Sequence, residues 1–294
     1  MQLSVIIVNY NVREYLEQCL VSVQKAILYL NNESEIIVID NNSTDRSIEY
    51  LQPKFPGVKF ISNKENLGFA KACNQGIEMS SGKYVLFLNP DTIVPGNCFQ
   101  KCISFFESNN DAGALGVKMV NDKGKYLKES KRGFPSPAAS FFKLFGLAAI
   151  FPKSKLFAKY YLGHLDENKN QEVDTIAGAF MMISREVLEK VGGFDESFFM
   201  YGEDIDLSYR VKKAGYKNYY LAETFITHFK GKSTRQKNEE YTKVFYNAMD
   251  IFVKKHYMKE KNFLFLIFIR TGIGIRKTMA LAGNRLTKIF SGKQ

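Results

Sequence analysis

Hydrophobic residues in the first third of the chain form short continuous runs that alternate with segments of helical spacing. Continuous β-branched runs indicate strands buried on both faces, and apolar positions three or four apart indicate amphipathic helices. This alternation predicts an α/β fold whose mostly parallel, mixed sheet has right-handed crossovers and helices on both faces. The predicted strands cover residues 3–8, 36–39, 58–61 and 84–88, and the predicted helices cover 13–30, a short stretch between 45 and Pro53, and 68–79.

The second half of the chain has a less regular pattern. Residues 121–170 contain several Gly and Pro residues among basic and aromatic ones, which predicts a long loop region with some helix around 138–150. Long loops in compact domains are usually functional or mobile. Four further elements are predicted: a strand over 174–183, a helix capped by Ser184 that ends at Gly192, a helix over 203–214, and a strand over 216–221.

Polar residues end the predicted strands, where ligands bind in open α/β sheets. These residues are Asn9, Asp40, Asn89 and Asp91. A carboxylate at the exposed end of a buried strand, such as Asp91, can bind a hard divalent cation whose remaining ligands are substrate phosphates. Asn-Pro-Asp is also an ordinary turn sequence, so both interpretations of this stretch stay open.

Three acids, Glu203, Asp204 and Asp206, lie at a predicted helix start. Acids in the first turn of a helix interact favourably with the helix dipole, which would explain this cluster by structure alone. However, mutual repulsion tends to raise the pKa of a carboxylate in such a group. A carboxylate so placed can act as general base towards a sugar hydroxyl.

His228 is followed closely by Lys230 and Lys232, on either side of a glycine. Imidazole is a common ligand for borderline metals such as manganese, and lysines beside glycine suit a diphosphate. A lone histidine is more often structural, so this motif alone does not decide its function.

The formal net charge of +11 suits a polyanionic partner such as nucleic acid, an anionic membrane or a phosphorylated ligand. From residue 254 onward there are ten Lys or Arg and one acid, Glu260, around an apolar run at 263–269 that is far shorter than the ~20 residues needed to span a bilayer. This segment fits a helix in the membrane interface, the alternative being a helix packed on the protein's own core.

Nucleic acid is disfavoured as a partner because the aromatic residues have core spacing and acids end the strands.

The sequence indicates a cytoplasmic protein. The N-terminal region lacks the basic segment and cleavage site of a signal peptide. The four cysteines form neither a CxxC pair nor a zinc-ligand spacing, so we expect reduced, partly buried thiols. With the basic tail, this predicts a peripheral protein on the inner face of a bacterial cytoplasmic membrane.

Taken in their order along the chain, the motifs resemble those of family 2 inverting glycosyltransferases, whose bacterial members include rhamnosyltransferases and galactofuranosyltransferases. Each motif alone is loose, whereas the ordered set is specific and spans residues 5–233, about four-fifths of the chain. The matching stretches are 5–11, 38–45, 66–70, 89–92, 192–196, 202–207 and the segment from His228.

This resemblance implies a GT-A fold over residues 1–240, with a nucleotide-binding half at 1–120 and an acceptor-binding half at 121–240. Residues 241–294 lie beyond it as a helical, basic, membrane-associating extension. The resemblance also implies nucleotide-sugar contacts along the first half. Asn9 and Asp40 are expected to line the nucleoside pocket, and Asn66, Gly68 and Lys71 to border the nucleotide. The resemblance assigns nucleotide-sugar binding also to Tyr10, Asn42 and Asn89.

The resemblance assigns the chemistry to the later motifs. Asn89 stands where many relatives have the first Asp of an Asp-x-Asp metal motif, so Asp91 and His228 are expected to carry most of the binding of Mn²⁺ or Mg²⁺. Asp204 matches the catalytic base, with Glu203 as its neighbour. The base would accept a proton from the acceptor hydroxyl while the diphosphate leaves from the opposite face, aided by the metal and by Lys230 or Lys232.

The implied reaction moves a sugar from a nucleoside-diphosphate donor, with dTDP-rhamnose as the first guess, to a saccharide acceptor that is expected to be lipid-linked. UDP-hexose and UDP-galactofuranose remain open as donors. Two alternatives are a catalytically silent nucleotide-sugar-binding scaffold and a sugar nucleotidyltransferase. The latter usually needs a glycine-rich loop after the first strand, where this chain has Asn9-Tyr10-Asn11-Val12-Arg13.

Overall fold

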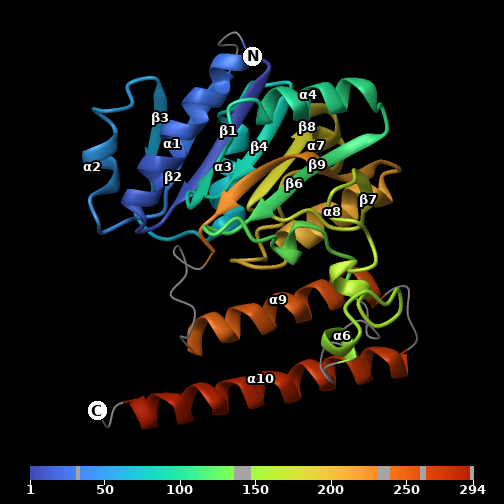
Figure 1. Cartoon of the computed structure of the whole chain (residues 1–294). Helices are drawn as coiled ribbons and strands as arrows, with labels where there is room; N and C mark the ends of the chain where they lie inside the picture. The colour runs from blue at the N-terminus through green and yellow to red at the C-terminus, as the bar shows by residue number, and fades with distance from the viewer. Residues whose placement is uncertain (31–33, 136–146, 231–238, 259–262, 292–294) are drawn as a thin grey trace.

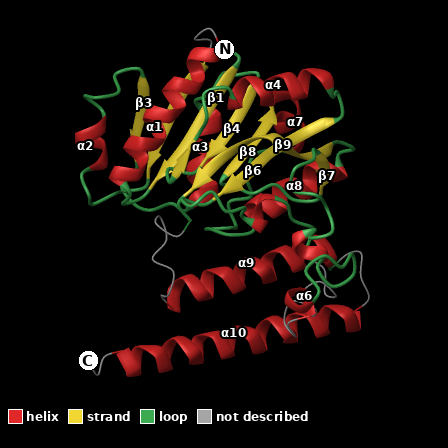
Figure 2. Ribbon diagram, in the orientation of Figure 1, coloured by secondary structure: helices red, strands yellow, loops and turns green. Residues whose placement is uncertain are grey.

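A single mixed β-sheet forms the centre of the protein (Figures 1 and 2). The computed structural model describes residues 1–30, 34–135, 147–230, 239–258 and 263–291. The strand order is β3-β2-β1-β4-β8-β6-β9-β5, and β7 pairs with β9. The strands are β1 (Leu3–Asn9), β2 (Ser34–Asp40), β3 (Val58–Ser62), β4 (Tyr84–Leu88), β5 (Thr92–Ile93), β6 (Ala112–Val120), β7 (Gln171–Val173), β8 (Phe180–Ser184) and β9 (Lys217–His228).

Strands β1 to β4 pair in parallel, and so do β6 and β9. Strand β8 runs antiparallel between β4 and β6, and the short strands β5 and β7 are antiparallel to β9. The predicted α/β fold with a mixed sheet is confirmed. Because β1 and β4 are parallel neighbours, the polar residues that follow them reach the same edge of the sheet.

Helices cover both faces of the sheet and bury two apolar cores. One core packs α1 and α4 against the sheet, and the other packs α3, α7 and α8 against the opposite face. The helices of the described residues are α1 (Arg13–Ile27), α2 (Ser47–Leu51), α3 (Phe69–Glu78), α4 (Cys98–Ser108), α6 (Leu147–Ile150), α7 (Arg185–Val191), α8 (Glu203–Lys213), α9 (Glu239–Tyr257) and α10 (Phe263–Ser291).

Two strand predictions in the second half need correction. The strand predicted over 174–183 is instead β7 and β8, because residues 174–179 leave the sheet to contact the loop at Arg132 and the start of α8. The last strand runs to His228 rather than ending at 221, and it continues through an irregular register beside β6. Elements α4 and β6 were not predicted, and most of the helix expected around 138–150 lies outside the described residues.

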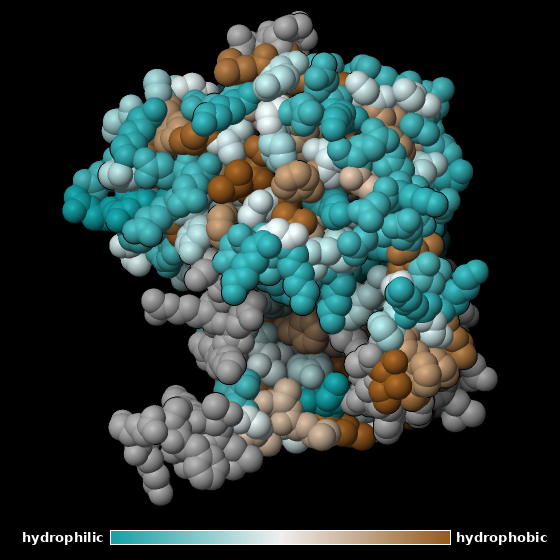
Figure 3. All heavy atoms as spheres, viewed as in Figure 1, coloured by the Kyte–Doolittle hydropathy of each residue, from teal (hydrophilic) through white to brown (hydrophobic). Residues whose placement is uncertain are grey.

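The last two helices lie side by side below the sheet in Figure 1, with α9 between the sheet and α10. In the space-filling view, hydrophilic side chains cover most of the sheet domain, whereas hydrophobic ones gather over the α6 end of the lower part (Figure 3). Within the described ranges, no helix combines the length and apolar character that crossing a bilayer requires.

Candidate active site

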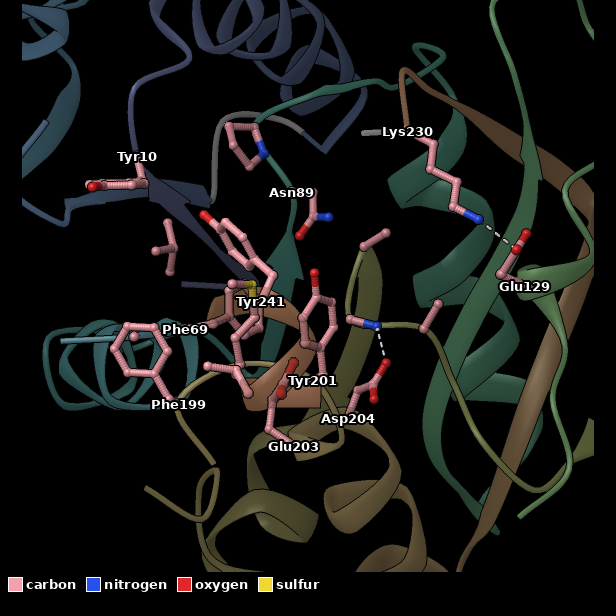
Figure 4. A pocket seen from close by; sticks show the side chains of 18 of the residues that line it. Tyr10, Phe69, Asn89, Glu129, Phe199, Tyr201, Glu203, Asp204, Lys230 and Tyr241 are labelled. Atoms are coloured by element: carbon pink, nitrogen blue, oxygen red, sulfur yellow. Dashed lines mark hydrogen bonds and ion pairs between the residues drawn. The ribbon is translucent and has the colours of Figure 1, made fainter. Parts of the chain in front are cut away.

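A cleft of about 720 Å³ opens at the carboxyl edge of the sheet. Residues that follow β1 and β4, the end of β9, the start of α8 and the first turns of α9 all contribute to its lining (Figure 4). The lining includes Tyr10, Asn41, Asn66, Gly68, Asn89, Glu129, Arg132, Gly178, Tyr201, Glu203, Asp204, His228, Lys230, Glu240 and Tyr241.

Asp204 lies in the first turn of α8 and faces this cleft. Its Oδ2 accepts a hydrogen bond from the backbone N–H of Gly178 at 3.0 Å and forms an ion pair with Arg132 Nη2 at 2.5 Å. Both charged side chains are only 13% exposed. The carboxylate is therefore held as an oriented anion near the positive end of a helix dipole.

Arg132 is a site residue that no motif in the sequence indicated. Its guanidinium also donates to the carbonyl oxygen of Ile176, so the ion pair joins the 121–170 loop region to the backbone before β8. Burial disfavours its charge, but the neighbouring Asp204 carboxylate outweighs this and raises the pKa of Arg132. The only indication of Arg132 in the sequence was its place in the long loop region 121–170, which was expected to be functional or mobile.

Glu203 is the most perturbed carboxyl group of the cleft. Burial, and secondarily the negative charge of Asp204, raise its pKa to about 8, so the side chain is mostly protonated at neutral pH. Its Oε2 is buried and makes no hydrogen bond within the described part of the chain. A protonated carboxyl group in a cleft can donate a hydrogen bond, which the ionised neighbour cannot do.

Asp206, the third acid, points away from the cleft. Its fully buried carboxylate contacts Arg210 at 2.8 Å, Lys255 at 2.8 Å and His256 at 2.6 Å. Burial alone would raise its pKa, but the hydrogen bond from His256 and the charges of Arg210 and Lys255 outweigh it and lower the pKa to about 2. Asp206 therefore attaches α9 to α8.

Asp91 and His228 meet at the opposite side of the cleft. The antiparallel pairing of β5 with β9 sets Thr92 opposite His228, which brings His228 Nε2 within 3.3 Å of Asp91 Oδ1. His228 lines the cleft, whereas the carboxylate of Asp91 is buried behind it.

The pair fits a divalent cation in donor type, since it combines a carboxylate oxygen with an imidazole nitrogen. Within the described ranges, no cluster of three or more His, Cys, Asp and Glu side chains suits a metal. A cation held by Asp91 and His228 would therefore take its other ligands from the substrate and water.

One end of the cleft is built around Gly68. This glycine has a φ of 83°, and a Cβ there would lie 2.4 Å from the carbonyl oxygen of Phe199. Asn66 accepts a hydrogen bond from the N–H of Gly68, and Asn41, which the sequence analysis did not single out, donates to its carbonyl oxygen at 3.0 Å. Tyr10, Asn66, Gly68 and Asn89 all line the cleft, and their role as nucleotide-sugar contacts stays a prediction.

Other expected nucleotide contacts lie outside the cleft lining. Asn9 donates to Asp40 at 2.7 Å, and both side chains are buried behind the cleft. Asn42 and Lys71 are exposed elsewhere on the surface. Lys230 lines the cleft and is paired with Glu129 at 2.6 Å, while Lys232 lies outside the described residues.

Comparison with known proteins agrees with this geometry. The model of glycosyl transferase family 2 matches residues 4–192, and a model described as the N-terminal domain of galactosyltransferase matches residues 164–245. The chain is 28% identical over 243 residues to the N-acetylglucosaminyl-diphospho-decaprenol L-rhamnosyltransferase of Mycobacterium tuberculosis, covering 79% of this chain and 77% of the relative. It is 27% identical over 236 residues to rhamnosyltransferase WbbL of Escherichia coli, covering 76% of this chain and 82% of that relative.

Solved structures share the fold. The mannosyltransferase PcManGT of Pyrobaculum calidifontis, solved with GDP-Man and Mn²⁺, superposes with a TM-score of 0.58 at 15% identity, covering 97% of this chain and 73% of that one. GalNAc-T7, solved with UDP, GalNAc and Mn²⁺, gives a TM-score of 0.56 at 18% identity, and the match spans 78% of this chain but only 44% of that longer one. With a family model covering more than half of its length and a cleft at the expected sheet edge, this chain belongs to glycosyl transferase family 2 and has the GT-A fold.

Proposed function

We propose that the protein transfers a sugar, with inversion, from a nucleoside-diphosphate donor to a lipid-linked saccharide during cell-surface polysaccharide synthesis. The observation that carries the proposal is the Asp204 carboxylate, oriented in the cleft by Arg132 and by the N–H of Gly178. A fixed, partly desolvated carboxylate beside a cavity of this size is suited to general base catalysis.

In this mechanism, Asp204 accepts the proton of an acceptor hydroxyl as that oxygen attacks the anomeric carbon of the donor. The bond between the anomeric carbon and the diphosphate oxygen breaks on the opposite face, so the configuration inverts. Arg132 orients Asp204 through their ion pair, and its positive charge offsets that of the carboxylate. Protonated Glu203 can donate a hydrogen bond to a sugar oxygen in the same cleft.

His228, which lines the cleft, and Asp91, which is buried behind it, would hold Mn²⁺ or Mg²⁺, supported by their donor types and by their contact with each other. When bound, such a cation supplies neutralisation of the charge that develops on the leaving diphosphate. Lys230 lines the same cleft and is paired with Glu129. It would help to neutralise the diphosphate if the diphosphate replaces Glu129 as its partner. Two structures of this fold were solved with Mn²⁺, which supports the choice of metal.

The donor and acceptor are proposed from the relatives. Two curated relatives are named rhamnosyltransferases, and one name specifies an N-acetylglucosaminyl-diphospho-decaprenol substrate. We therefore propose dTDP-rhamnose as donor and a sugar carried on a lipid diphosphate as acceptor. UDP-hexose and UDP-galactofuranose are the alternative donors.

We further propose that the lower helices contact the anionic inner face of a bacterial cytoplasmic membrane. Exposed apolar side chains at Ile150, Phe151, Leu156, Ile267, Ile275 and Met279 support this, because they gather in α6, the turns after it and α10. Basic residues in the same segments add ~1 kcal/mol each near an anionic surface. The boundary near residue 240 would then separate the catalytic domain from an extension whose first helix completes the cleft.

The proposal is tested by incubating the protein and Mn²⁺ with each donor and a short-chain prenyl diphosphate N-acetylglucosamine. We expect sugar transfer from one donor, with inverted anomeric configuration in the NMR spectrum of the product. Nucleotide binding without transfer or hydrolysis would favour the silent scaffold instead. Release of pyrophosphate from a nucleoside triphosphate and a sugar phosphate would favour the nucleotidyltransferase.

A further inference from the structure

One wall of the cleft belongs neither to the strand ends nor to α8. Glu240, Tyr241 and Val244 lie in the first turns of α9 and line the cleft. Tyr201, which directly precedes the Gly202 cap of α8, lines it beside them. In Figure 4 the ring of Tyr201 lies beside Glu203 and Asp204, whereas the ring of Tyr241 lies farther from these acids, on the side towards Asn89. We refer to Tyr201, Glu240, Tyr241 and Val244 as the α9 wall.

The backbone of this wall is held in an unusual conformation. Tyr201 has a φ of 69°, which non-glycine residues seldom adopt, and the following Gly202 has a φ of 86°. The ring of Tyr201 packs edge-on against Phe245 of α9, with the centroids 5.8 Å apart. Strained backbone that persists at a cleft indicates a conformation fixed by its surroundings and needed for function.

Helix α9 is fixed to the catalytic domain by buried contacts rather than by surface charge alone. Phe198, Ala248 and Phe252 form a separate apolar core between the loop before α8 and α9. Lys255 pairs with Asp195 at 2.5 Å, and His256 binds the buried Asp206 at 2.6 Å. The wall is therefore a preorganised part of the cleft.

The chemistry of the wall suits a saccharide. Two tyrosine rings offer flat apolar surfaces for the C–H faces of a sugar, and their hydroxyls, with the Glu240 carboxylate, offer hydrogen-bonding groups. Because Tyr201 is three residues before Asp204 in the chain and beside it in the cleft, a sugar on this wall presents its hydroxyls to the proposed base.

We infer that the α9 wall is the subsite for the acceptor saccharide, an assignment that rests on the proposed function. Helix α9 lies between the cleft and α10, whose exposed face carries Ile267, Ile275 and Met279. An acceptor whose lipid stays in a membrane below α10 reaches Asp204 along α9. The same helix thus positions the sugar and links the cleft to the membrane-facing surface.

A binding experiment tests this without requiring turnover. The chain contains no tryptophan, so Tyr241→Trp introduces a single indole into the wall. We expect little change in its fluorescence on adding dTDP with Mn²⁺, and a saturable change on then adding the prenyl diphosphate N-acetylglucosamine. Tyr246→Trp, on the same helix but outside the cleft lining, is the control and should respond to neither.

A kinetic experiment addresses the same assignment. Tyr241→Ala should raise the KM for the acceptor roughly tenfold, as expected for the loss of about one ring contact. The Kd for dTDP should stay within about twofold of wild type, as should every parameter of Tyr246→Ala.

Three outcomes would overturn the inference: an indole at 241 that responds to dTDP alone, one that is silent towards the acceptor, or an acceptor KM that Tyr241→Ala leaves unchanged. Failure of the proposed function would look different. The wild type would then transfer or hydrolyse none of the donors, whatever the indole at 241 reports about binding.

Discussion

The first turn of α8 presents two faces with opposite functions. Towards the cleft, Asp204 has one buried cation, Arg132, and space for a substrate. Towards α9, Asp206 is enclosed by Arg210, Lys255 and His256 with no exposed surface. Although the two carboxylates are two residues apart, one is available for proton transfer and the other is saturated with partners. The role open to each acid therefore depends on the basic groups that contact it, and not on its place in a cluster of acids.

The largest effect is expected at the cleft face. Asp204→Asn removes the proposed proton acceptor while keeping the shape of the side chain, so transfer should fall by about 10²–10⁴-fold. The rate of transfer under saturating donor and acceptor measures this. Asp206→Asn is the matched control and should retain transfer under conditions in which the variant is folded. An equal loss of transfer in both variants would contradict the different roles of Asp204 and Asp206.

The face towards α9 should control stability. Asp206→Asn removes the negative charge that compensates Arg210, Lys255 and His256, and breaking such a buried pair costs about 3 kcal/mol of unfolding free energy. Urea denaturation measures the loss. In Asp250→Asn, which breaks partly exposed pairs to Lys254 and Arg270, the loss should stay below about 1 kcal/mol. Similar losses in both variants would show that Asp206 does not fix α9.

The same contacts predict how stability depends on pH. Because the pKa of Asp206 falls from 3.8 to about 2 on folding, its contribution is present above pH 4 and is lost as the pH falls towards 2. Asp206→Asn should therefore differ most from wild type at neutral pH and converge with it near pH 2. Acid titration of unfolding free energy, followed by circular dichroism, would contradict this if the two curves stayed parallel.

Glu203 should show the opposite pH dependence. Its pKa rises from 4.5 to about 8 on folding, so the native state keeps a proton that the unfolded state releases. Wild-type stability should therefore decline as pH rises from about 4.5 to 8, by at most about 1.4 kcal/mol per pH unit. Glu203→Gln cannot ionise and should remove this decline. If the unfolding free energies of wild type and Glu203→Gln changed with pH at the same slope between pH 5 and 8, the buried, protonated state of Glu203 would be contradicted.

The smallest effect is expected at α10. Arg270 pairs with Asp250 at 2.8 Å while half exposed, so Arg270→Ala should change unfolding free energy by less than about 1 kcal/mol. Transfer onto a detergent-free, water-soluble acceptor should be unaffected. Binding to vesicles of anionic phospholipid should weaken, which sedimentation measures against vesicles of neutral lipid. Unchanged vesicle binding would place the membrane surface elsewhere.

The sequence predicted the first four strands and the edge at which the cleft lies, because buried apolar runs and the polar residues that end them follow general rules of parallel sheets. Asn89 follows such a run, whereas Asp204 begins a helix and His228 ends a strand that was predicted to stop at residue 221. The sequence could not predict Arg132, which belongs to no motif and reaches Asp204 only through the bridge between Arg132 and Thr175. It also could not indicate that α9 forms a wall, because the contact of His256 with Asp206 joins residues fifty positions apart.

We propose that Asp204 performs chemistry in a cleft that binds the nucleotide without it. The most direct test measures dTDP affinity and single-turnover transfer in Asp204→Asn and wild type, with Mn²⁺ present throughout. We expect the two proteins to bind dTDP within about twofold of each other, and transfer to be about 10²–10⁴-fold slower in Asp204→Asn. Transfer by Asp204→Asn at the wild-type rate, or loss of nucleotide binding together with transfer, would contradict it.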